Sequence, residues 1–170
     1  MNKYLKTAYQ FGTLGGILSI LSFFILSLIY SDPTNLNLVF GYFVTPIALF
    51  LGIKFFKEYT NNGFLSFAEG MTVGFVTYIL MGLLSALGIW AILLTVPDLF
   101  DKIQEIKWAD LNQNKDLFIS QVGLKSFEAA QLSLQEMSAW DVALNDGIWK
   151  IIPGMFFSII ISIILRRNPN

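Results

Sequence analysis

The sequence predicts an all-α integral membrane protein: a single domain over residues 1–170, built as a four-helix bundle with a helical extracytoplasmic cap between spans three and four. Hydrophobic residues make up 55% of the 170 residues and charged residues only 14%, whereas soluble domains usually carry about 25% charged residues. In addition, 89 positions lie in four uncharged runs, at 7–31, 33–53, 70–97 and 151–165. This composition excludes a soluble globular enzyme, a disordered tail and, because cysteine is absent, a disulfide scaffold.

Four segments have the length and composition of membrane-spanning helices. A span needs about 20 apolar residues, because a rise of ~1.5 Å per residue must cross a hydrocarbon layer of roughly 30 Å. The first three uncharged runs meet this length, and the fourth does so when it is extended back through Trp149 and Ile148. The extension includes Lys150, whose amine we expect to reach the headgroups. The predicted spans are 11–30, 38–56, 70–95 and 148–165.

The first segment has an alternative interpretation as a signal peptide, because Lys3 and Lys6 precede its apolar stretch. That stretch is longer than the ~7–15 residues of a signal peptide, and no A-x-A-like cleavage site follows it. The sequence therefore favours an uncleaved first span.

The distribution of basic residues predicts the orientation. Positive charge concentrates on the cytoplasmic side of membrane proteins, and here the basic flanks alternate along the chain. The predicted cytoplasmic flanks hold six basic residues, whereas the opposite side is net acidic, with Asp32 followed by nine acidic residues and five lysines over 97–150. Both termini are therefore predicted to be cytoplasmic in a multi-pass protein, from the positions of Lys3, Lys6, Lys54, Lys57, Arg166 and Arg167.

The segments between the spans carry two local signals. Ser66 and Glu69 match a capping box at the start of the third span, and Asn61-Asn62-Gly63 before it reads as a helix stop. Glu69 then has a structural role, although a cation or proton site at the cytoplasmic end is an alternative. Residues 98–146 show weak helical periodicity, which predicts two amphipathic helices that form the cap and lean on the bilayer, the spans or a partner.

Small residues recur at helical spacing in every span and predict close helix packing, since small side chains allow backbones to approach within lipid. The same pattern would serve contacts with a second copy or another protein. The predicted packing residues are Gly12, Gly16, Gly41, Gly52, Gly70, Gly74, Gly82, Ala86, Gly154, Ser158 and Ser162.

The residue types present limit the possible chemistry. The chain has no His and no Cys, so the usual ligands of zinc, copper, haem and iron–sulfur clusters are missing, and we expect no catalytic residue, metal or cofactor. A net charge of −1 with dispersed Lys and Arg argues against nucleic acid. The polar groups expected inside the spans are hydroxyls, with no ionisable group near the centre, which argues against a proton- or sodium-coupled carrier.

The order of these features resembles an uncharacterised domain-of-unknown-function family of small four-helix inner-membrane proteins common in Bacteroidota. The resemblance covers nearly the whole chain and implies a bacterial inner membrane, but it implies no activity and no catalytic residue. It depends on Tyr9-Gln10-Phe11-Gly12, on Ser66-Phe67-Ala68-Glu69-Gly70 with Gly74 beyond, on the polar helical segment before the last span, and on the ending 154–167.

The sequence thus favours a non-enzymatic accessory or assembly subunit of a membrane complex, with the lipid bilayer and a membrane-protein partner or a second copy as its contacts. The alternative is a small oligomeric pore or solute transporter, suggested by hydroxyl-bearing helices and by Pro46 within the second span. A membrane-embedded enzyme is disfavoured because no catalytic constellation is recognisable.

Overall fold

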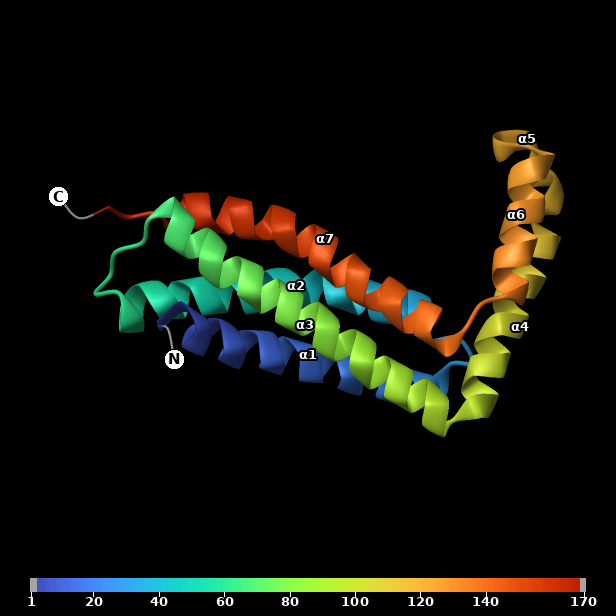
Figure 1. The fold of residues 1–170 in the computed structure, drawn as a ribbon, viewed down its shortest axis with the longest axis horizontal. Helices are drawn as coiled ribbons and strands as arrows, with labels where there is room; N and C mark the ends of the chain where they lie inside the picture. Colours follow the sequence, from blue (N-terminus) through green and yellow to red (C-terminus); the bar gives the residue numbers. More distant parts are fainter. Residues whose placement is uncertain (1–2, 169–170) are drawn as a thin grey trace.

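The computed structural model describes residues 3–168, and all of its regular elements are helices (Figure 1). Within those residues the only β-type pairing is an isolated bridge between Leu65 and Arg167. The long helices are α1 (Lys3–Ile29), α2 (Thr34–Phe55), α3 (Phe67–Thr95) and α7 (Ala139–Leu165). A π-helical turn, η1 (Phe56–Thr60), extends α2, and three shorter helices lie between α3 and α7: α4 (Pro97–Gln113), α5 (Lys115–Val122) and α6 (Leu124–Gln135).

The four long helices pack side by side (Figure 1). α1 contacts α2 and α3, and α7 in turn contacts α2 and α3, so the four form a ring, with α2 and α3 also touching across it. All four, with α2 counted through η1, are long and apolar enough to cross a membrane. The all-helical prediction is confirmed, and the fold is compatible with a multi-pass membrane protein.

The interior contains two apolar clusters with a polar layer between them. One cluster includes Leu49, Phe56 and Val73, and the other includes Phe23 and Ile89. The polar layer, described below, lies between these clusters along α3 and α7. Large apolar side chains also cover the outer faces of the long helices, as expected for surfaces in contact with lipid tails; the most exposed include Leu28, Phe43, Ile163 and Ile164.

Both chain ends and the α2–α3 connection lie at one end of the long helices, whereas α4, α5 and α6 lie at the other (Figure 1). We call α4, α5 and α6 together the arm. The arm runs crosswise to the long helices and projects sideways past them (Figure 1). The six basic residues that predict the orientation all belong to chain segments at the end where the termini lie. This is what the predicted orientation requires. Which end faces the cytoplasm remains a prediction.

The fourth long helix begins earlier than predicted. Residues 139–147, which the sequence argument assigned to the region outside the fourth span, form the first turns of α7. A second capping box starts this helix: Ser138 Oγ accepts from the Asp141 N–H, and the Asp141 carboxylate accepts from the Ser138 N–H. Asn145-Asp146-Gly147 has a composition typical of turns, but it continues the helix, and Gly147 packs directly on Gly82 of α3.

The arm also differs from the prediction of two helices, because it contains three. Asn114 ends α4 and Gly123 separates α5 from α6. Gly123 has φ 87°, a conformation that side-chain-bearing residues rarely adopt. By contrast, the predicted stop after the second span is observed, since the helix ends at Thr60 and is followed by positive φ at Asn62 and Gly63.

Candidate functional site

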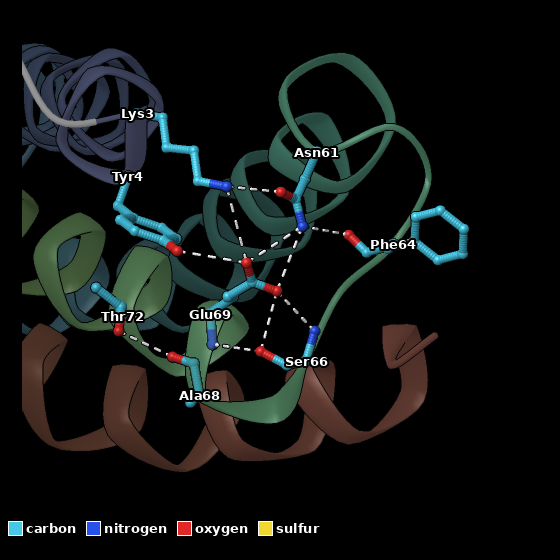
Figure 2. A network of polar contacts seen from close by, with 8 residues as sticks. All are labelled: Lys3, Tyr4, Asn61, Phe64, Ser66, Ala68, Glu69 and Thr72. Atoms are coloured by element: carbon cyan, nitrogen blue, oxygen red, sulfur yellow. Dashed lines mark hydrogen bonds and ion pairs between the residues drawn. The ribbon is translucent and has the colours of Figure 1, made fainter. Parts of the chain in front are cut away.

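Two polar clusters join segments that are far apart in the sequence, and the first surrounds Glu69 at the end with the termini (Figure 2). The capping box is complete: Ser66 Oγ accepts from the Glu69 N–H at 3.2 Å, and Glu69 Oε2 accepts from the Ser66 N–H at 2.9 Å. Glu69 also accepts hydrogen bonds from Tyr4 Oη at 3.3 Å and Asn61 Nδ2 at 3.2 Å. Lys3 Nζ lies 3.9 Å from Glu69 Oε1 and donates to Asn61 Oδ1 at 2.7 Å.

This cluster ties the start of α1, the α2–α3 connection and the start of α3 to one carboxylate. Its hydrogen-bond donors come from the loop and the helix ends around it. Glu69 therefore holds these segments together at this end of the long helices. The geometry therefore supports the structural interpretation of Glu69, and the cation or proton site is not needed to explain it.

The second cluster lies inside the long helices, around Asp146 of α7. The Asp146 carboxylate accepts hydrogen bonds from Asn37 Nδ2 at 2.7 Å, Ser85 Oγ at 2.6 Å and Lys150 Nζ at 2.5 Å. Its donors thus come from α2, α3 and α7. All four side chains are buried, and Lys150 is only 1% exposed. We call these four residues the Asp146 cluster.

The cluster contradicts two expectations from the sequence. Lys150 does not extend its amine to the surface but turns back one helical turn to pair with Asp146. The long helices therefore do contain ionisable groups: at ~1.5 Å per residue, Asp146 and Lys150 lie about 10 Å and about 16 Å from the start of α7. Such groups are costly in a membrane and typically mark functional sites.

Gly41 of α2 provides the space for the Lys150 side chain. A Cβ atom at Gly41 would lie 3.3 Å from Lys150 Cε and 3.5 Å from its Nζ. Gly41 was predicted to allow close packing of helices. In the structure its missing side chain also leaves room for the buried Lys150 amine.

Most of the other predicted packing residues lie where two long helices meet. A Cβ atom would come within 3.0 Å of a neighbouring helix at Gly12 and Gly16 of α1, at Gly70, Gly74 and Gly82 of α3, and at Gly154 of α7, whereas Gly52 faces the ring of Phe11. The serines are part of these contacts, since Gly70 faces Ser162 and Gly74 faces Ser158, and Ala86 lies against Gly147.

A cleft of about 490 Å³ leads to the Asp146 cluster from the end where the arm lies. It is lined by the first turns of α2 and α7, by α4 and α6, and by Phe23 of α1. Its charged lining residues are Lys107, Glu136, Asp141 and Asp146. Lys107 is engaged at the cleft wall, where its Nζ lies 3.6 Å from Asp32 Oδ2 and donates to Thr34 Oγ1 at 3.1 Å.

The residues of this site were not predicted to lie together, although the sequence carries two signals for it. Asp146 and Lys150 are four residues apart, the spacing at which an acid and a base pair on one helix face. Ser138 and Asp141 have the spacing of a capping box, which places a helix start before Asp146 rather than after it. Asn37 and Ser85 carry no such signal, because only the packing of α2 and α3 brings them to the carboxylate.

The described residues, 3–168, contain no group of three or more acidic, His or Cys side chains that could hold a metal ion. The Asp146 cluster itself offers one carboxylate, one amine, one amide and one hydroxyl, which form hydrogen bonds and a charge pair.

The comparisons with known proteins are consistent with this description. No curated protein and no solved structure matches the chain. A family model matches residues 10–167, which include α2, α3, α7, the arm and all of α1 except its first seven residues. The chain therefore belongs to the family described as protein of unknown function DUF4199.

Proposed function

We propose that this chain is a non-enzymatic accessory or assembly subunit of a membrane complex in a bacterial inner membrane, and that it binds a neighbouring membrane protein through its arm. In this proposal both termini are cytoplasmic and the arm lies on the outer surface.

The observation that carries the proposal is that the arm has almost no core of its own. Among its helices, only Leu99 and Ile103 of α4 and Phe127 of α6 are buried, and α5 buries no residue. A segment with so little buried surface is not expected to hold its structure alone. Its exposed large apolar residues are Ile106, Leu117, Val122, Leu124 and Leu132.

Charge favours a protein over a lipid surface as the occupant of this face. Helices that bind membrane surfaces are usually rich in Lys and Arg, because many bilayers are anionic. Residues 97–138 instead contain seven acidic residues and four lysines, a net charge of −3. Val122 and Leu124 flank Gly123 where α5 meets α6, and Leu117 is a further exposed apolar residue of α5. These three residues are the proposed contact with a partner protein.

The test is purification of the tagged chain from its native membrane in mild detergent, followed by native mass spectrometry. We expect a stoichiometric membrane-protein companion. Replacing Leu117, Val122 and Leu124 together by Ser should lower its recovery at least about tenfold, equivalent to about 1.4 kcal/mol of binding free energy. The matched control replaces Gln121, Lys125 and Glu128 by Ser in the same segment and should retain the companion.

A lone monomer, or a companion that the apolar variant retains, would contradict the proposal. A stoichiometric second copy of this chain in place of another protein would replace it with a homo-oligomer.

A second candidate function is a small oligomeric pore or solute transporter, favoured by the buried Asp146–Lys150 pair at the foot of a cleft. Flux into reconstituted vesicles, compared between the natural chain and a Thr45→Leu variant, tests it. Thr45 is a buried hydroxyl of α2. The absence of flux under any imposed gradient would exclude this candidate.

A further inference from the structure

We infer that the groove between α1 and α3 binds one acyl chain of an anionic phospholipid, and that the Lys6 amine pairs with the phosphate of that lipid. The inference goes beyond the accessory function, because it concerns the lipid-facing side of the long helices and requires only that these helices cross a membrane.

The first support is the shape of the groove. Its volume is about 340 Å³, and the exposed atoms that line it are all apolar. It is lined by Leu5 and Tyr9 of α1 and by residues of α3 between Phe75 and Leu83. At ~1.5 Å per residue the groove therefore runs for about 12 Å along α3. This length is less than half of a hydrocarbon layer of roughly 30 Å, so it suits part of one acyl chain within one leaflet.

The second support is the position of Lys6 at one end of the groove. α1 and α3 run in the same direction (Figure 1), and Gly12 packs against the Thr77 carbonyl oxygen. Six residues earlier in α1, Lys6 therefore lies about one turn before Phe75, at the end of the groove that faces the termini. Lys6 is also three residues before Tyr9, the spacing of neighbours on one helix surface. Its long side chain can place the amine among headgroups while its stem stays beside the groove.

The third support is the uncompensated charge of Lys6. Among residues 3–168 Lys6 has no ion pair, whereas Lys3 lies 3.9 Å from Glu69. These three residues give this corner a net charge of +1. Lys6 is also the last charged residue before the uncharged run 7–31, which places it at the edge of the hydrocarbon layer. Basic residues between membrane-spanning helices bind anionic headgroups, and each one near the surface strengthens binding about fivefold.

A second copy of the chain suits the groove less well than a lipid. A symmetric dimer brings the same surface patch of both copies into contact, and two copies in one membrane have the same orientation. Lys6 of each copy would then approach Lys6 of the other beside a layer of low dielectric, where like charges repel strongly. An anionic phospholipid instead offers an acyl chain to the groove and a negative charge to the amine.

The test uses the full chain, purified in mild detergent, delipidated, and mixed with equal amounts of phosphatidylglycerol and phosphatidylcholine that carry the same acyl chains. Native mass spectrometry measures the ratio of the two bound lipids. We expect phosphatidylglycerol to be preferred, and Lys6→Gln should lower this preference about fivefold. Lys6→Arg should retain it. Lys57→Gln is the matched control, because Lys57 belongs to the same end, has no ion pair among the described residues and does not line the groove.

Filling the groove tests the acyl part of the inference. Leu83→Trp enlarges an exposed side chain that lines the groove and should reduce the binding of both lipids several-fold. Leu87→Trp is the matched control, since Leu87 is equally exposed one turn further along α3 and lies outside the groove. An excess of inorganic phosphate should not displace the lipid, because it has no acyl chain.

Equal binding of the two lipids, a preference that survives Lys6→Gln, full lipid binding by Leu83→Trp, or displacement by phosphate would each overturn the inference. A companion protein that is lost from Leu83→Trp would show that the groove binds protein instead of lipid. The variant with Leu117, Val122 and Leu124 replaced by Ser, which tests the accessory function, should keep its lipid, so the two proposals fail separately.

Discussion

The amine of Lys150 lies within a helix long enough to cross a membrane, where an unpaired charge would be costly. It is tolerated because Asp146 is one turn away, and because that carboxylate also accepts hydrogen bonds from Asn37 at Oδ1 and from Ser85 at Oδ2. Breaking a buried pair by removing one partner is far more destabilising than removing both, since the remaining charge has no compensation.

We therefore expect Lys150→Met to lower the free energy of unfolding by about 3–5 kcal/mol. Combining it with Asp146→Asn, which keeps hydrogen-bonding atoms toward Asn37 and Ser85, should recover more than half of the loss. Unfolding in mixed detergent micelles measures both. The exposed pair Lys54–Glu58, at 4.0 Å, provides the control, because Lys54→Met should change stability by less than about 1 kcal/mol. A Lys150→Met variant as stable as the natural chain would refute this account of the cluster.

A second prediction at the residue scale concerns the two capping serines. Ser66→Ala and Ser138→Ala each remove the acceptor for an N-terminal amide of α3 or α7, and each should lower the free energy of unfolding by about 1 kcal/mol. Ser66→Ala should cost more than Ser138→Ala, because its capping carboxylate also holds Tyr4 and Asn61. The exposed Ser126→Ala serves as the reference, and the opposite order would show that the Glu69 cluster contributes little.

At the scale of the elements, α3 and α7 approach closely because glycines face each other. A Cβ atom at Gly82 would lie 2.9 Å from the Gly147 carbonyl oxygen and 2.6 Å from Ile151 Cγ1. The Ile151 side chain can move, but the carbonyl belongs to the backbone of α7, so the helices would have to separate. Separation would also pull Ser85 away from Asp146, which couples helix packing to the buried cluster.

Gly82→Ala is accordingly expected to destabilise the fold by about 1–3 kcal/mol through overpacking, despite the higher helix propensity of Ala. Ala91→Leu, an enlargement on an exposed face of the same helix, should have little effect. The comparison uses the same unfolding assay, and equal tolerance of both changes would contradict the close approach of α3 and α7.

At the scale of the whole molecule, the arm and the two termini lie at opposite ends of the long helices (Figure 1). If the basic residues set the orientation, a cysteine in place of Asn62 in the α2–α3 connection should react with an impermeant thiol reagent only after sealed spheroplasts are opened. Ser126→Cys on the arm should react in intact spheroplasts. The reverse pattern would place the termini outside, and labelling of both cysteines in intact spheroplasts would refute the four-span topology.

Much of the architecture could be predicted from composition. Apolar runs long enough to cross a bilayer identify three of the four long helices and the apolar part of the fourth, because lipid requires each span to satisfy its own backbone hydrogen bonds. The same reasoning placed the start of the fourth helix too late. It counted Asp146 among the acidic residues of the aqueous segment, an assignment that holds only when such a residue has no buried partners.

The membrane class, the helical architecture, the capping box at Ser66 and the small residues along each long helix could all be predicted from the order of the residues. These properties depend on local pattern and on the low dielectric of lipid. The joint burial of Asp146 and Lys150 could not be predicted in this way, because Asn37 and Ser85, which make it tolerable, are 109 and 61 residues away from Asp146 along the chain. The energy of a buried charge depends on what surrounds it in space, and that information is absent from the order of the residues.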